Sequence, residues 1–399
     1  MSQISSTPNS SAVEIKKVVR RRVVRTVNAI PENILNNEEL NQAIKLLPAN
    51  YNFEIHKTVW HIEKNKATRV ALQFPEGLLM YSCIISDILE TFCKVEVVIM
   101  GDVTYGACCI DDYSAISLGC DFMVHYGHSC LVPVNTTKIK TMYVFVEIGI
   151  NTSHFIETVK LNFKPNSRLC FVGIVQFLSS LHYAKKQLED QYTIIIPQSK
   201  PLSPGEVLGC TSPRLPEIDA IVFLGDGRFH LESILIHNPG VPAYAYDPYS
   251  KKLTIEKYNH EQMYNLRQDA INTARKAKRF GLILGTLGRQ GSPKVLEDIE
   301  ARLIKADKEY TIVLLSEIYP QKLDTFSDID CWIQIACPRL SIDWGYAFSK
   351  PLLSPYELSV ALGNIKWQQP YPMDFYSNES LGTYTPNHIK IPVNTSIEY

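Results

Sequence analysis

Ten cysteines are the residues of this 399-residue chain best suited to hold a metal or a cluster. Four of them follow predicted strands in loops marked by Gly or Pro: Cys108 and Cys109 in GDVTYGACC, Cys210 in GEVLGCTSP and Cys337 in IQIACPRLSIDWG. Open α/β sheets bind ligands beyond the carboxyl ends of their strands, so these loops are where a cofactor would be held. No CxxC pair accompanies them, unlike the ligands of a local zinc knuckle.

The chemistry open to these four cysteines is metal or cluster ligation. Dispersed thiolates could hold a tetrahedral Zn²⁺ or an iron–sulfur cluster, and a [4Fe–4S] cluster bound by three cysteines would leave one iron open. The loop residue Cys130 is predicted to be structural. The remaining cysteines lie among apolar residues of predicted helices and strands, where cysteine acts as a small buried residue: Cys83, Cys93, Cys120, Cys170 and Cys331.

Composition restricts the class of protein. Lys and Arg (40) balance Asp and Glu (41), which argues against a protein that coats nucleic acid, and we expect no direct nucleic-acid role. No run of 18 apolar residues is present, so no membrane span or membrane partner is predicted. The cysteines are too sparse for a disulfide scaffold and no secretory signal opens the chain. We therefore predict a cytoplasmic protein with reduced thiols.

The elements that must position these cysteines form an internal triplication. Three times a hydrophobic strand leads into a Gly- or Pro-marked turn and a helix, beginning at Arg69, Arg168 and Arg279. A second buried strand follows each time, and then a third strand, which closes six residues after an aspartate. These aspartates are Asp121, Asp219 and Asp330. A fourth element follows in the first two copies, at 141–149 and 241–248.

Apolar strands that alternate with helices are typical of parallel sheets covered on both faces. We predict an α/β fold of three homologous, doubly wound, flavodoxin-like or Rossmann-like domains. Their predicted ranges are 29–150 with an N-terminal helix, 151–265 and 266–365. Residues 1–28 are predicted to be a disordered basic arm, which is either merely solvated, a targeting address or a contact for an acidic or RNA-bound partner. Residues 366–399 are predicted to be an extended tail on the surface.

Local signals mark two helix starts in the third repeat. Ser292 is a predicted N-cap before Pro293, and Ser354 with Glu357 forms a predicted capping box. The first of these helices is predicted to turn one apolar stripe toward the sheet, made of Leu296, Ile299, Leu303 and Ile304.

Several motifs together resemble the diphthamide biosynthesis family of 2-(3-amino-3-carboxypropyl)histidine synthases. They are GDVTYGACCIDD, VLGCTSPR, LGTLGRQGS and IACPRLSIDWG, with IPENIL before and YPMDFY after, and the resemblance spans roughly residues 25–377. It implies three flavodoxin-like domains around a central [4Fe–4S] cluster that takes one cysteine from each. The implied ligands are Cys108, Cys210 and Cys337, with Cys109 as the neighbouring alternative to Cys108.

The resemblance also implies an activity and partners. The 3-amino-3-carboxypropyl group of S-adenosylmethionine would be transferred by radical chemistry to C2 of a histidine of translation elongation factor 2. This is the first step of diphthamide formation. A related second subunit in a heterodimer and an electron-donor protein are implied as well. The main alternative is a non-catalytic scaffold subunit that binds the cluster; a Rossmann-type NAD or flavin enzyme and a zinc protein are further rivals, the former disfavoured because its fingerprint is absent.

The loop 285–291 (GTLGRQG) lies at a predicted strand end before a helix, which is a natural anion site. We predict that it binds S-adenosylmethionine, with Arg289 clamping the carboxylate. The alternative is a tight turn with a surface arginine. The predicted binding residues are Thr286, Gly288, Arg289, Gln290 and Gly291. Other polar residues that lie where strand ends should converge are predicted to be structural: Gln73, Asp102, His128 and Arg214.

Overall fold

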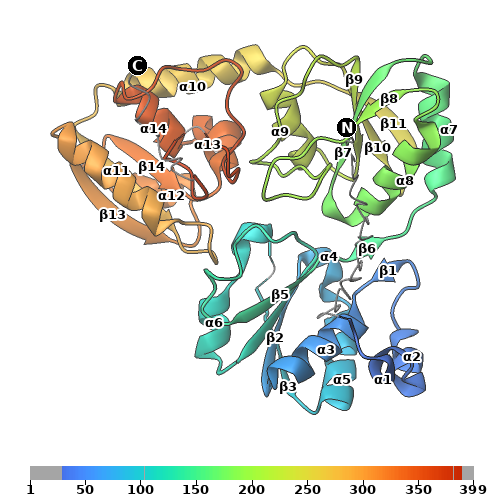
Figure 1. Ribbon diagram of the computed structural model, residues 1–399. Helices are drawn as coiled ribbons and strands as arrows, with labels where there is room; N and C mark the ends of the chain where they lie inside the picture. Colours follow the sequence, from blue (N-terminus) through green and yellow to red (C-terminus); the bar gives the residue numbers. More distant parts are fainter. Residues whose placement is uncertain (1–28, 103, 381, 389–399) are drawn as a thin grey trace, which may run out of the picture.

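The computed structural model describes residues 29–102, 104–380 and 382–388. These residues form three α/β units, and Figure 1 shows the units grouped around a common centre. The predicted basic arm, residues 1–28, and the last eleven residues of the predicted tail lie outside the described residues.

The first unit contains a four-stranded parallel sheet in the order β3-β2-β4-β5. A short antiparallel pair, β1 with β6, links this unit to the start of the second. Its strands are β1 (Tyr51–Asn52), β2 (Arg69–Gln73), β3 (Glu96–Ile99), β4 (Phe122–Tyr126), β5 (Lys140–Val144) and β6 (Glu147–Ile148). Its helices are α1 (Glu32–Leu35), α2 (Glu38–Ile44), α3 (Ile55–Asn65), α4 (Glu76–Leu79), α5 (Ser82–Cys93), α6 (Asp112–Ser117) and the 3₁₀ turn η1 (Ala107–Cys109).

The second unit contains a five-stranded sheet in the order β8-β7-β9-β10-β11, in which only β11 is antiparallel. Its strands are β7 (Arg168–Gly173), β8 (Thr193–Ile195), β9 (Ala220–Leu224), β10 (Ala243–Asp247) and β11 (Lys252–Glu256). Its helices are α7 (Thr152–Asn162), α8 (Leu178–Leu188), α9 (Phe229–His237) and the 3₁₀ turn η2 (Val175–Phe177).

The third unit contains a four-stranded parallel sheet in the order β13-β12-β14-β15. Its strands are β12 (Arg279–Gly285), β13 (Glu309–Leu315), β14 (Cys331–Ile335) and β15 (Leu352–Leu353). Its helices are α10 (His260–Ala274), α11 (Pro293–Lys305), α12 (Pro320–Asp324), α13 (Pro338–Trp344), α14 (Pro355–Ala361) and the 3₁₀ turn η3 (Gly345–Ala347). The two-residue β15 is a fourth strand that the sequence pattern did not reveal.

The prediction of an α/β fold is confirmed. All three sheets place the second strand of the repeat at one edge, followed by the first, third and fourth, as flavodoxin-like sheets do. The repeated aspartate explains part of this order. Its N–H donates to the carbonyl of the first-strand arginine at 2.9 Å, and its carboxylate accepts from that arginine's N–H, which joins the first and third strands. The pairs are Asp121 with Arg69, Asp219 with Arg168, and Asp330 with Arg279.

The boundary predicted between residues 265 and 266 falls inside α10. The whole helix belongs to the third unit, because Met263 and Ile271 pack in that unit's core. The buried Arg267 also makes a two-pronged ion pair with Glu357 of α14, at 2.6 and 2.7 Å. The sequence did not predict that α10 belongs to the third unit, because the many polar residues of this helix do not indicate which sheet it covers.

Helix starts in the third unit are largely as predicted. Ser354 and Glu357 form the capping box, and Pro293 is the first residue of α11. Ser292 occupies the N-cap position, but its side chain makes no capping hydrogen bond. The predicted stripe is partly wrong: Ile299 and Leu303 are buried, whereas Ile304 is 65% exposed. The stripe continues through the buried Val295 instead.

The predicted surface tail is instead part of the interior. Its described residues have little regular structure, but several large side chains are buried: Tyr371, Met373, Phe375, Tyr376 and Tyr384. They pack in the core of the third unit and against the loop of Cys210 in the second. The many Pro and Tyr residues indicated an irregular segment correctly, but they did not show that it runs between two units.

Candidate functional site

Cys108 and Cys109 lie on η1, in the loop between β3 and α6. The buried Gln73, at the end of β2, holds this loop: its Nε2 donates to the carbonyl of Cys109 at 3.1 Å, and its Oε1 accepts from the N–H of Asp111 at 3.3 Å. His125 of β4 contacts the same Oε1 through Nδ1 at 2.9 Å. The structural role predicted for Gln73 is confirmed.

Cys210 lies in a loop that the C-terminal segment covers. The N–H of Phe375 donates to the carbonyl of Cys210 at 3.2 Å, and the N–H of Ser212 donates to the carbonyl of Met373 at 2.8 Å. The hydroxyl of Thr211 accepts from the N–H of Tyr376 at 3.0 Å. The tail therefore pairs with the cysteine loop almost as a strand would.

Cys337 is the N-cap residue of α13, directly after β14. Gln334 donates to its carbonyl at 2.9 Å, which fixes the turn. Arg339, the second residue of the helix and only 3% exposed, donates to the carbonyls of Gly209 and Phe229 at 3.2 and 2.7 Å. Arg339 thus joins the Cys337 turn of the third unit to the Cys210 loop of the second.

The three predicted ligands lie within electrostatic reach of one another. A hydrogen bond with Cys109, burial, and the charges of Cys109, Cys337 and Cys210 raise the pKa of Cys108 well above its usual value. Burial and the neighbouring Cys337 raise the pKa of Cys210 to about 12. Burial raises the pKa of Cys337 as well. One thiol from each unit therefore reaches a shared, partly buried place.

Cys109 differs electrostatically from its neighbour. The hydrogen bond from Cys108 lowers the pKa of Cys109 to about 7, against the opposing effect of burial. Cys109 is also the more buried of the two. Because ligands bind metals as thiolates, both members of the pair remain candidates for the ligand of the first unit.

Tyr376 of the tail lies among the three thiols. Burial, and then the charges of Cys108, Cys210 and Cys337, raise its pKa well above the usual value. Its hydroxyl is buried and faces Cys108, but the contact lacks the geometry of a hydrogen bond, so this oxygen has no partner. The sequence patterns did not indicate Tyr376 as a site residue, although it belongs to the motif YPMDFY.

The candidate donors are cysteines from three units. Within residues 29–102, 104–380 and 382–388, no three His, Cys, Asp or Glu side chains are spaced to hold one metal ion. An iron–sulfur cluster makes a different demand, because each cysteine binds a different iron. Apolar neighbours of Cys108 and Cys210, such as Leu202 and Phe375, would shield a cluster from water.

The loop 285–291 packs on the Cys108–Cys109 turn. The N–H of Arg289 donates to the carbonyl of Cys108 at 2.9 Å, and Gln290 Nε2 lies 3.9 Å from Cys109 Sγ. Gly288 has φ +55°, and a Cβ there would lie 2.5 Å from the Cys109 carbonyl, so only glycine fits. The third unit therefore supports the cysteines of the first.

The alternative of a tight turn with a surface arginine is correct for the turn, in which Gly288 has φ +55°, but wrong for Arg289, which is not on the surface. Its side chain is 16% exposed, and its Nε and Nη2 donate to the two carboxylate oxygens of the buried Asp112 at 2.8 and 2.6 Å. It also stacks over the ring of Tyr113 at 4.1 Å. Binding of S-adenosylmethionine by this loop stays a prediction, and Arg289 already has an ionic partner from the first unit.

The remaining cysteines divide by burial. Cys120, Cys170 and Cys331 are buried as predicted, and Cys93 is half-buried. Cys83 is exposed, so the prediction for this residue is wrong; it lies on α5 on the side away from the core. The Cys130 thiol contacts the carbonyl of Val132 at 3.7 Å, as a structural residue would.

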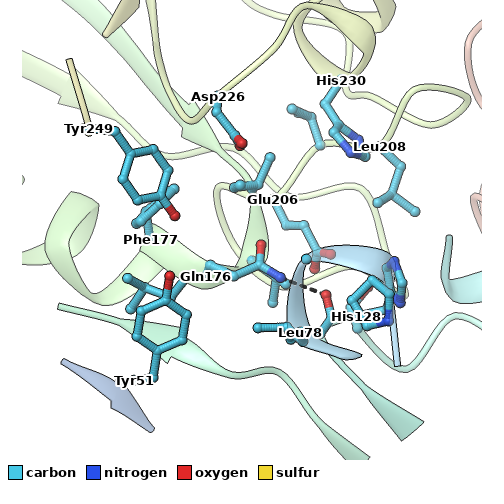
Figure 2. Close-up of a pocket in the computed structure, with 18 residues that line it drawn as sticks. Tyr51, Leu78, His128, Gln176, Phe177, Glu206, Leu208, Asp226, His230 and Tyr249 are labelled. Atoms are coloured by element: carbon cyan, nitrogen blue, oxygen red, sulfur yellow. Dashed lines mark hydrogen bonds between the residues drawn. The ribbon is translucent and has the colours of Figure 1, made fainter. Parts of the chain in front are cut away.

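Two of the other polar residues have clear surroundings. Arg214 donates through Nε to His237 Nε2 at 3.2 Å, which is a structural role, and Asp102 is exposed. His128 lies beside a cavity between the first and second units (Figure 2) and has a buried ring nitrogen without a partner.

None of the described helices is long and apolar enough to cross a membrane.

Comparison with known proteins identifies the family. A family model for diphthamide synthesis proteins matches residues 74–372, which includes all four candidate cysteines. The chain belongs to the diphthamide synthesis family. Among its relatives in this family, 2-(3-amino-3-carboxypropyl)histidine synthase subunit 1 of Schizosaccharomyces pombe is 58% identical over 95% of this chain and 89% of its own length. Subunit 1 of Homo sapiens is 58% identical over 91% of this chain and 84% of its own length.

A solved structure in the diphthamide synthesis family is similar as well. Dph2 from Pyrococcus horikoshii with a 4Fe-4S cluster matches with a TM-score of 0.67 and 26% identity, over 81% of this chain and 93% of that chain. The relatives' names describe the synthesis of an aminocarboxypropyl-modified histidine, and the Dph2 structure holds a 4Fe-4S cluster. Both agree with the donor chemistry of the site.

Proposed function

We propose that this chain is the catalytic subunit that transfers the 3-amino-3-carboxypropyl group of S-adenosylmethionine to C2 of a histidine of translation elongation factor 2. The observation that carries the proposal is that one cysteine from each of three repeated units reaches a single place, with Tyr376 among them. Cys108, Cys210 and Cys337 would hold a [4Fe–4S] cluster there. Three cysteines leave one iron for the sulfonium cofactor.

The residues around the cysteines position the ligand turns and exclude water from the thiols. When bound, such a cluster supplies an electron for cleavage of the bond between the sulfonium sulfur and the methionine Cγ, which releases 5′-methylthioadenosine. Gln73 and Gln334 fix the carbonyls of two ligand turns, and Arg339 ties the second unit to the third. Phe375 and its neighbours exclude water from the thiols.

The proposal includes partners. The named relatives are subunits of a synthase, so we propose a related second subunit in a heterodimer and a separate electron-donor protein. The alternative is a scaffold subunit that binds a cluster while its partner performs the transfer. A cysteine in each of the three units of this chain favours the catalytic subunit.

Metal content tests the cluster. The chain is purified anaerobically with its partner, and iron, sulfide and zinc are measured. We expect iron and sulfide in equal amounts, with losses in Cys108→Ala, Cys210→Ala and Cys337→Ala. The exposed Cys83→Ala is the matched control and should keep its iron. The variant Cys109→Ala shows which member of the pair is the ligand. Wild-type iron in all three ligand variants would refute the cluster.

Product analysis tests the transfer. The complex is incubated with reductant, S-adenosylmethionine and elongation factor 2, and we expect the factor to gain the mass of one aminocarboxypropyl group. Methylthioadenosine should appear as the second product, whereas 5′-deoxyadenosine would indicate a different bond cleavage. The same assay is repeated with Cys108→Ala, Cys210→Ala and Cys337→Ala in this chain and an unaltered partner. Full transfer by these complexes would favour the scaffold alternative.

A further inference from the structure

The outer edge of the third unit's sheet is formed by β13, which pairs with β12 and with no other described strand. The N–H of Glu309 and the carbonyl of Leu315 bond toward the β12 side, at 3.2 and 2.9 Å. Because a parallel strand bonds to one neighbour through every second residue, the N–H and C=O groups of the residues between them point outward. The residues that offer their backbone to a further strand are Tyr310, Ile312 and Leu314.

The side chains of this edge are apolar. After its first residue the strand reads YTIVLL, without a charged residue, Gly or Pro. Ile312 is 39% exposed and Leu314 is 63% exposed, on the face of the sheet that α11 covers. Glu300 of α11 interacts with Tyr310, so this side of the helix lies over β13. Ile304, four residues after Glu300, is 65% exposed and extends the apolar surface. We call this surface the β13 edge.

The other two units show that such an edge is not inherent in the repeat. β3 and β8 occupy the same place in their sheets but have four and three residues, against seven in β13. Their exposed residues are polar, Glu96 and Thr193. The edge strand β11 exposes Ile255, but Lys252 and Glu256 bracket it. Short strands and charges protect sheet edges, and the last six residues of β13 have neither protection.

An open edge of this kind requires a cover. Figure 1 shows β13 and α11 on the outside of the molecule, at its left edge. An uncharged edge of high β propensity would pair with other chains and aggregate if it stayed open to solvent. Strand addition is the contact that this surface fits, because the outward N–H and C=O groups supply hydrogen bonds and the aliphatic side chains supply packing.

The size of the β13 edge indicates a folded partner rather than a short peptide. Seven residues of strand span about 23 Å, and with the flanking side of α11 the strip is about 15 Å wide. Each partner in a standard stable interface buries about 800 Å², more than twice the area of this strip. Strand pairing alone is therefore insufficient, and the partner must add contacts beside it, for example to Tyr319, which is 42% exposed in the loop after β13.

A second chain of the same family would have the required architecture. The relatives of this chain are named as subunit 1 of a synthase, which implies a further subunit. A chain built from the same repeat would present an edge strand with a helix beside it, as β13 has α11 beside it. Such a partner would also stand next to the support of the cysteine site, because the carbonyl of Leu315 accepts from the N–H of Thr286 in the loop 285–291.

We propose that the β13 edge is the docking site of the related second subunit, which adds one of its own edge strands to the sheet of the third unit. The inference rests on the proposed function for the existence of that subunit and adds the surface that binds it. A second copy of this chain is the competing occupant, since it would present the same edge.

The affinity between the two subunits tests this inference. The complex is purified anaerobically and diluted, and mass photometry gives the dissociation constant. We expect Leu314→Lys and Ile304→Lys each to weaken binding about tenfold or more, because a charge is placed in a dry interface. Both positions are exposed, so the unfolding temperature and the iron content should stay as in the wild type. The matched control is Ile255→Lys, which changes a 67% exposed residue of β11 and should bind as wild type.

Hydrogen exchange distinguishes strand addition from another kind of contact. We expect the amides of Ile312 and Leu314 to exchange more slowly in the complex than in this chain alone, and those of β11 to exchange at an unchanged rate. Wild-type affinity in both lysine variants, or unchanged exchange in β13, would overturn the inference. A dimer of this chain alone that Leu314→Lys converts into monomers would overturn it as well. Failure of the proposed function looks different: the complex would form and depend on Leu314, but would transfer nothing to elongation factor 2.

Discussion

At the scale of single residues, the hydroxyl of Tyr376 is the most informative group at the cysteine site. It is buried among three thiols from three units and has no hydrogen-bond partner. We expect Tyr376→Phe to raise the stability of the cluster-free protein by about 1 kcal/mol, because an unsatisfied buried polar group is removed. Urea denaturation measures this change.

The same variant should act differently when the proposed cluster is present. If the hydroxyl donates to a sulfur of the cluster, its loss should make the reduction potential more negative, at unchanged iron content. Protein-film voltammetry measures the potential. An identical potential in Tyr376→Phe would show that the hydroxyl does not touch the cluster.

His237 gives the fold a dependence on pH. Its Nδ1 donates to the carbonyl of Ser212 at 2.7 Å and its Nε2 accepts from Arg214, so the folded state holds the neutral ring. Burial lowers its pKa to about 4, below the usual 6.5. Between these values only the unfolded state takes up the proton. Stability should therefore fall by up to about 3 kcal/mol as the pH drops from 7 to 4.

The variant His237→Asn separates this contribution from those of other histidines. Its amide can still donate to Ser212, but it does not titrate. We expect the unfolding free energy of the variant to depend less steeply on pH between 7 and 4 than that of the wild type, measured by urea denaturation at several pH values. Equal slopes would refute the assignment.

At the scale of elements, the loop 285–291 acts as a support for the cysteine turn. Arg289 neutralises Asp112, which is fully buried, across the boundary between the third and first units. We expect Arg289→Met to destabilise the protein by about 3–5 kcal/mol, because an unpaired carboxylate is left buried. Iron content should fall too, since the loop contacts Cys108 and Cys109.

Arg302→Met is the control for this prediction. Arg302 pairs with Asp298 on α11, where both side chains are partly exposed, and such pairs contribute about 1 kcal/mol or less. Thermal unfolding and iron analysis of the two variants distinguish the cases. If both variants lose similarly little stability and iron, the ion pair of Arg289 does not stabilise the cysteine turn more than an ordinary surface pair would.

The strands and helices were predicted from the sequence more accurately than the contacts between them. The strands were recognisable because parallel strands buried on both faces are nearly continuous apolar runs, and the aspartates at 121, 219 and 330 marked their shared geometry. The amphipathic α10 and the tail were less well predicted, because their partners are distant in the chain. The predicted burial of Cys83 and Ile304 was wrong for a related reason, because residue type alone does not reveal which side of a helix faces the core.

At the scale of the whole molecule, the tail joins the second and third units over Cys210. We expect a chain truncated after residue 369 to lose its iron and much of its stability, because five buried aromatic or Met side chains and the cover of Cys210 are removed. Truncation after residue 388 removes none of the described contacts, so it should preserve both the iron content and the stability. Iron analysis and thermal unfolding of the two truncated proteins measure the difference.

The candidate ligands were identifiable as strand-end cysteines and by family resemblance, whereas their surroundings were not. Tyr376 reaches the thiols only because the tail folds back over a loop 165 residues earlier in the sequence. No local pattern encodes such a contact. The cavity beside His128 was equally hidden, since its walls come from two units and a single unit shows only half of it.

The order of the site residues along the chain bears on how the protein matures. A ribosome adds about 5–20 residues per second, so Cys108 is made roughly 13–54 s before Tyr376. Until Cys337 is made, the first two cysteine loops lack the third loop, and they lack their cover until Tyr376 follows. A cluster held by all three cysteines can therefore form only after the third loop has been made, and the cover supplied by Tyr376 is added later still.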